Sequence, residues 1–190
     1  MFEDIASLSG TELYLYIASL LSGVIQLVLS ILMTQFKELK NIYIAKFFAN
    51  VVMTLTGLLR GPEGMSSALV GALATVMTGA VYFIRKKGEE PKKLFLVIAG
   101  IVYVGAVALT FRKPQDVIPL ICGAMFIIGL GLSDTKRYRM LNLVQMTLWL
   151  PYDFMAEMFT QLVTHGITAV GYIVGLFRHD LRREKKKQPT

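Results

Sequence analysis

The run LYLYIASLLSGVIQLVLSILMTQF, residues 13–36, contains no Asp, Glu, Lys or Arg. Three more runs, residues 64–84, 94–111 and 158–177, are also free of these four residue types. Each run is long enough for an α-helix to cross a bilayer, which takes roughly 17–25 apolar residues. The sequence therefore predicts an all-α membrane protein that crosses the bilayer several times.

Composition supports this prediction. Of 190 residues, 54% are hydrophobic and 17% are charged, and the mean hydropathy is +0.56. A soluble domain carries roughly 25% charged residues. The flank before residue 13 is acidic and no small-residue cleavage site follows the first run, so we expect that run to remain as a membrane helix. The single cysteine, Cys122, excludes an internal disulfide.

Seven spans account for the pattern of charge. Sixteen of the 20 Lys and Arg residues fall in the odd-numbered connections and the tail, which must share one side of the membrane. The positive-inside rule then places the N-terminus outside and the C-terminus in the cytoplasm. Topology thus explains the net charge of +7, and we expect the lipid bilayer, not nucleic acid, as the partner. The expected spans are roughly residues 13–35, 41–59, 64–84, 94–111, 117–133, 140–157 and 159–178.

The chain also matches itself in residue class. Residues 37–58 and 136–157 align at an offset of 99, each beginning with a basic cluster (KELK and KRYR). We therefore expect a single domain, residues 1–190, built from two parallel three-helix repeats, a plan known among transporters. The first repeat covers residues 13–86, a linker helix covers 94–111, the second repeat covers 117–178, and residues 179–190 form a basic cytoplasmic tail.

Four segments carry a resemblance to a known family. KELKNIYIAKFFANVVMTLTGLLRG (37–61), GMSSAL (64–69), QDVIPLICG (115–123) and LWLPYDFMAE (148–157) resemble the YgjV-type bacterial inner-membrane proteins. The 3+1+3 plan is similar to the SWEET and PnuC transporters, although the first span lacks the paired Pro-Gln of the SWEET pattern. The resemblance implies this fold, a bacterial inner membrane, a transporter-like ancestry and a trimer, but no substrate.

A polar stripe crosses the sixth expected span. Its members recur at spacings of three and four, which places them on one helix face: Asn142, Gln145, Trp149, Tyr152, Asp153 and Ala156. The offset of 99 carries part of this stripe to Lys46 and Asn50 in the second span. An ionised side chain at a helix centre costs roughly 2.5–3.5 kcal/mol in lipid, so both stripes are expected to face the interior. Pro151 frees the Thr147 carbonyl, which we expect near Asp153.

From these stripes we predict a substrate-binding site between the repeats. Trp149 and Tyr152 would stack on a ring, and the polar side chains would bind hydroxyls or amines. The full set is Lys46, Asn50, Gln145, Trp149, Tyr152 and Asp153.

Simpler interpretations of the same residues stay open. Asp153 and Glu157 can mark the outer headgroup boundary, and Lys46 can extend to the cytoplasmic surface. Asn50 and Gln145 can join helices by hydrogen bonds. His165 can relay protons, or it can stay neutral and bond to a neighbouring helix. Gly171 and Gly175 form a GxxxG motif, which favours close helix packing.

No catalytic signature accompanies these residues. The sequence has no GxSxG, Walker or dinucleotide motif, and two histidines with one cysteine do not supply a zinc site. We therefore expect no catalytic residues, metal or cofactor. The first hypothesis is a small facilitative transporter of a polar small metabolite. The alternative is a non-transporting integral membrane protein that acts as a partner or assembly subunit.

Overall fold

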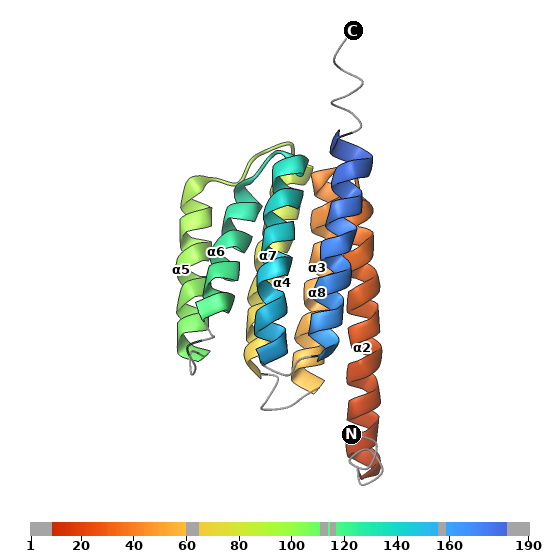
Figure 1. Cartoon of the computed structure of the whole chain (residues 1–190). Helices are drawn as coiled ribbons and strands as arrows, with labels where there is room; N and C mark the ends of the chain where they lie inside the picture. The colour runs from red at the N-terminus through yellow and green to blue at the C-terminus, as the bar shows by residue number, and fades with distance from the viewer. Residues whose placement is uncertain (1–8, 60–64, 111–113, 115–116, 156–158, 182–190) are drawn as a thin grey trace.

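The computed structural model describes residues 9–59, 65–110, 114, 117–155 and 159–181. These residues form seven α-helices and a π-helical turn, and each helix lies on one of the expected spans, so the all-α prediction is confirmed (Figure 1). The elements are α2 (Gly10–Gln35), α3 (Leu39–Leu59), α4 (Met65–Lys86), α5 (Lys93–Thr110), α6 (Val117–Gly131), α7 (Thr135–Met155), α8 (Phe159–Gly175) and η3 (Leu176–Leu181).

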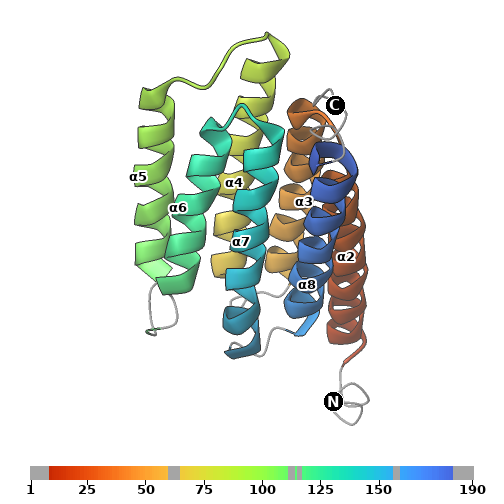
Figure 2. The same ribbon diagram turned by 45° about the horizontal axis from the view of Figure 1, so that its top comes forward.

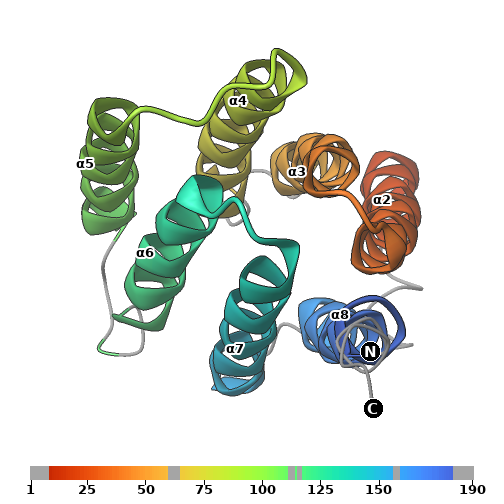
Figure 3. The same ribbon diagram turned by 90° about the horizontal axis from the view of Figure 1, so that it is seen from above.

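The helices form a ring. Each helix packs against the helices before and after it in the chain, and α8 also packs against α2, which closes the ring. Figure 3 shows the ring from above, and Figure 2 shows α6, α7 and α8 in front of α3 and α4. The two helices with polar stripes, α3 and α7, thus face each other across the interior. The division into two repeats and a linker stays a prediction.

The connections alternate between the two ends of the bundle. The α2–α3, α4–α5 and α6–α7 connections lie at the same end of the bundle as η3, and the beginning of α2 lies at the opposite end (Figure 1). The basic clusters of the odd-numbered connections are therefore gathered at one end, as expected. That this end faces the cytoplasm stays a prediction, and most of the expected basic tail, residues 182–190, lies outside the described residues.

Within the described part of the chain, four stretches are long and apolar enough to cross a membrane: Leu13–Gln35, Leu39–Leu59, Ala68–Lys86 and Phe159–Asp180. Two shorter apolar helices, Lys93–Leu109 and Val117–Gly131, lie beside them, whereas α7 is too polar to count by composition. The outer surface exposes large apolar side chains such as Val76, Ile101 and Leu109. Exposed apolar area on this scale is suited to lipid rather than to water.

Two arginines lock the basic end of the bundle. Arg139 is fully buried, its Nη1 lies 2.6 Å from the Asp180 carboxylate in η3, and it also donates to the Phe36 carbonyl just after α2. Arg85, at the end of α4, donates to the Leu132 carbonyl just after α6. Carbonyls at a helix C-terminus lack partners within the helix, and a cation there is favoured by the helix dipole. Each arginine therefore satisfies a carbonyl at the end of another helix and joins that helix to the bundle.

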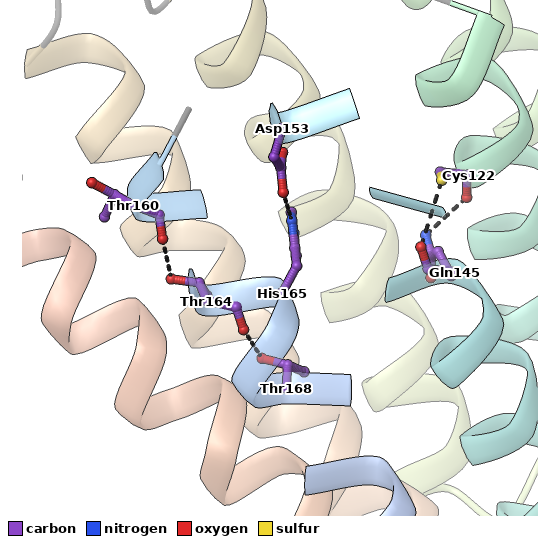
Figure 4. Close-up of polar contacts among 7 residues, drawn as sticks. All are labelled: Cys122, Gln145, Asp153, Thr160, Thr164, His165 and Thr168. Atoms are coloured by element: carbon purple, nitrogen blue, oxygen red, sulfur yellow. Dashed lines mark hydrogen bonds and ion pairs between the residues drawn. The ribbon is translucent and has the colours of Figure 1, made fainter. Parts of the chain in front are cut away.

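The seam between α2 and α8 is built differently. The hydroxyls of Thr164 and Thr168 donate to carbonyls one turn earlier in α8 (Figure 4). The Thr34 hydroxyl donates within α2. Such hydroxyls are satisfied by their own helix. Among the described side chains, only the Tyr172 hydroxyl bonds across this seam, to Met33 Sδ at 3.7 Å.

Glycines give this seam its closest approach. A Cβ atom on Gly175 would lie 2.5 Å from the Thr34 carbonyl oxygen, and one on Gly171 would lie 2.6 Å from Thr34 Oγ1. Both distances are shorter than a side chain tolerates, so only glycine allows the two backbones to meet here. The packing role predicted for the GxxxG motif is confirmed.

Gly175→Ala should therefore destabilise the protein by about 1–3 kcal/mol, because the new methyl group meets a backbone oxygen that has little freedom to move. Gly166→Ala in the same helix is the matched control, since its Cβ would lie 3.9 Å from Leu150 Cδ2, an ordinary contact. Thermal unfolding of both variants in detergent measures the difference. Equal stability of the two variants would contradict the close approach.

Candidate functional site

One face of α7 directs several polar side chains into the ring. The described members of the expected stripe fall on this face, and the buried residues of α7 are Tyr138, Arg139, Asn142, Gln145 and Asp153. Trp149 and Tyr152 are partly buried, and Ala156 lies outside the described residues. The helical spacing of the stripe therefore identified the inward face of α7 correctly. The contacts of this face gather in two places, one toward each end of the helix.

The first place, which we term the lysine centre, comprises Lys46, Phe126, Tyr138 and Asn142. Lys46 Nζ of α3 lies 2.9 Å from Asn142 Oδ1 and 3.1 Å from the Tyr138 hydroxyl, both on α7. The Asn142 amide nitrogen donates to the Tyr138 carbonyl, so its oxygen is left to face the lysine. The ammonium also lies over the Phe126 ring of α6, 5.0 Å from the ring centroid. Lys46 thus points into the bundle and bridges α3 to α7.

The partners of this lysine are all neutral. No carboxylate of the described residues lies within 4.0 Å of Lys46 Nζ. An ammonium has three hydrogen-bond donors, and two of them meet the oxygens of Tyr138 and Asn142. A cation in a low-dielectric interior without an anion beside it is costly. The lysine centre is therefore suited to hold an anionic or strongly polar group.

The other two amides of the predicted site bond to neighbouring helices. The Asn50 amide donates to Thr78 Oγ1 of α4 at 3.2 Å. The Gln145 amide donates to the Cys122 carbonyl of α6 at 2.8 Å, and the Cys122 thiol lies 3.8 Å from the Gln145 carbonyl (Figure 4). Both contacts correspond to the alternative interpretation of these residues, in which they join helices.

The second place, which we term the His–Asp centre, comprises Trp149, Tyr152, Asp153 and His165. Asp153 is 1% exposed, and its Oδ2 lies 2.6 Å from His165 Nδ1 on α8 (Figure 4). The indole of Trp149 stacks on the imidazole, with centroids 5.5 Å apart and planes 19° apart. The Tyr152 ring meets the indole edge-on at 5.3 Å. Asp153 is therefore paired inside the bundle.

Pro151 lies elsewhere on α7. Pro151 and Thr147 are exposed, whereas Asp153, two residues after the proline, is buried. The carbonyl that the proline frees thus belongs to the outer face of the helix and not to the His–Asp centre. The expected pocket of a freed carbonyl beside the carboxylate is not formed.

The structure therefore divides the predicted site residues. Trp149, Tyr152 and Asp153 lie together, Lys46 lies in the other centre, and Asn50 and Gln145 are in neither. The two centres are separated along α7 by 11 residues, which is about 16 Å at 1.5 Å per residue. Sharing of one solute by the six residues stays a prediction.

Three functional candidates were missed as site residues: Tyr138, Asn142 and His165. A signal existed for His165. Among residues 140–178 the carboxyl and imidazole groups are Asp153, Glu157 and His165, and the first and last of these lie on two successive helices that pack against each other. The partners of Lys46 had no such signal, because they depend on how α3 and α7 are rotated.

The described residues hold no cluster of three or more His, Cys, Asp or Glu that is suited to a metal ion.

The family model Imp-YgjV, described as a bacterial inner membrane protein, matches residues 17–183. This match covers the whole ring apart from the beginning of α2. No curated protein and no solved structure matches the chain.

The His–Asp centre predicts non-additive stabilities. His165→Leu should cost about 3–5 kcal/mol at neutral pH, because it leaves a buried carboxylate without its partner. The double variant His165→Leu/Asp153→Leu should cost much less, because it removes both polar groups together. Thermal unfolding of the wild type, the two single variants and the double variant completes the cycle. Additive losses would show that the two groups are not coupled.

Proposed function

The chain belongs to the Imp-YgjV family of bacterial inner membrane proteins, and from this premise we propose that it is a small facilitative carrier for a polar solute. The family description supplies the membrane and no activity. The proposal is supported chiefly by the lysine centre, where a cation inside the ring has only neutral partners.

A purely structural role explains this lysine poorly. An apolar side chain at position 46 would pack between α3, α6 and α7 without the cost of burying an ammonium. Ionisable side chains inside membrane bundles most often belong to substrate or ion pathways. A solute with a carboxylate, phosphate or other electron-rich oxygen would supply the acceptor that the described residues do not. The solute would then be bound between the middle helices of the two predicted repeats.

The same plan suggests how the carrier works. In transporters built from parallel repeats the substrate lies near the bilayer midplane between the repeats. The SWEET- and PnuC-like arrangement is part of this proposal, with movement of one three-helix unit against the other exposing the lysine centre to each side. With no nucleotide-binding motif in the sequence, net flux would follow the gradient of the solute.

The second candidate is the non-transporting partner or assembly subunit. The amides of Asn50 and Gln145 support it, because both are used in contacts to neighbouring helices. In this case polar substitutions in the interior would change stability or association, and no solute would bind. The two candidates therefore differ in whether any small molecule stabilises the purified protein.

The lysine centre provides the test. The protein, purified in detergent, is heated with sugars, nucleosides, vitamins, amino acids and small organic acids, and a solute at 100 times its Kd should stabilise it by about 2.7 kcal/mol. Lys46→Met should lose this effect while remaining folded, because the methionine keeps the length of the side chain without its charge. Lys40→Met is the matched control on α3, since Lys40 is exposed and pairs with Glu38.

A solute that stabilises Lys46→Met as much as the wild type would remove the lysine centre from the site. No stabilisation by any solute, together with a co-purifying protein, would favour the second candidate. For a solute that does bind, uptake into vesicles that contain each variant then separates a carrier from a protein that only binds.

A further inference from the structure

The His–Asp centre combines features that the carrier proposal does not use. The Asp153 side chain is 2% exposed and the His165 side chain is 18% exposed, so the carboxylate is enclosed while part of the imidazole can be reached. His165 Nδ1 is engaged with the carboxylate, and no described hydrogen bond involves Nε2. Histidine is the side chain that most readily gains and loses a proton near neutral pH.

The surroundings contain few other charges. On α7 the titratable neighbour is Tyr152, and on α6 the Cys122 thiol interacts electrostatically with Asp153. The α8 residues beside His165 are neutral, and α2, which packs on α8, has no charged residue in 13–36. Lys46 belongs to the other centre, about 16 Å away along α7. Among described residues, His165 is therefore the group that can neutralise Asp153.

We propose that Asp153 and His165 form a proton-binding site. The neutral imidazole donates Nδ1–H to the Asp153 carboxylate, which leaves the Nε2 lone pair free to accept a proton from water. One N–H bond forms, one O–H bond of a hydronium ion breaks, and the charge of the pair changes from −1 to 0. A role of this pair in coupling proton binding to solute movement rests on the carrier proposed above. Proton binding itself can be measured without any solute.

The enclosed position makes this change of charge consequential. A single negative charge in an apolar bundle is unfavourable, and binding one proton replaces it with a neutral ion pair. Proton binding therefore changes the free energy of packing α7 against α8. The change acts near the end of α7, from which the chain continues into α8. The arrangement of α7 and α8 would therefore depend on the pH on the side of the membrane from which Nε2 is accessible.

The chain carries its own reporter for this site. Trp149 is the single tryptophan, and it is stacked on His165. An imidazolium in contact with an excited indole quenches its fluorescence by accepting an electron, whereas neutral imidazole quenches far less. The chain has only two histidines, His165 and His179, so each can be tested separately.

The experiment measures Trp149 emission of the full-length protein in detergent between pH 5 and pH 9, with circular dichroism to confirm folding. We expect emission to fall along a one-proton curve as the pH is lowered through the range where histidine titrates. His165→Gln should abolish the change, because the amide can still bond to Asp153 but cannot take up a proton. His179→Gln, Glu157→Gln and Lys46→Met should retain the change in emission. Lys46→Met also tests the carrier proposal separately.

A wild-type emission that does not change over this range would overturn the proposal without any variant. A titration that persists in His165→Gln, or disappears in His179→Gln, would assign the proton to another group. If His165→Gln does not fold, Asp153→Asn provides the second test. The pH dependence of its emission should differ from that of the wild type, since the imidazole no longer has a carboxylate beside it, and an unchanged curve would show that the carboxylate takes no part.

Discussion

Polar side chains within this bundle must find their partners inside the ring, because lipid offers none. Closure of the ring by α2 and α8 is what makes this possible. The contact relies on Gly171 and Gly175, which let the first and last helices meet at Thr34. With the ring closed, one face of α7 is directed inward. Lys46, Gln145 and Asp153 then each reach a partner on another helix.

The strongest ties are distributed unevenly along the bundle. At the basic end, Arg85 and Arg139 bind carbonyls that terminate α6 and α2, and Arg139 also holds Asp180. Toward the other end, the contact between Asp153 and His165 joins α7 to α8. The lysine centre lies on α7 between these two levels. The ties of Arg139, Lys46, Gln145 and Asp153 all involve α7, whereas those of Arg85 and Asn50 join other helices.

The sequence predicted the helices well, because uncharged runs bounded by basic clusters are direct consequences of the bilayer. It also predicted which face of α7 is buried, since a spacing of three and four follows from helix geometry. Partner assignments were less accessible. Lys46 contacts Asn142 and not the other predicted site residues, because side-chain contacts depend on the rotation of α3 and α7 about their axes. The position of Thr147 and Pro151 on the outer face has the same cause.

The hydroxyls of the α2–α8 seam are satisfied within their own helices, and across it the described side chains form one bond, from Tyr172 to Met33. Parting these two helices therefore breaks packing contacts and almost no hydrogen bonds. At the basic end Arg139 still holds both Phe36 and Asp180, so the two helices cannot separate there without exposing a buried guanidinium. The two helices can therefore part at the end of the bundle away from Arg139 while this arginine keeps them joined at the basic end.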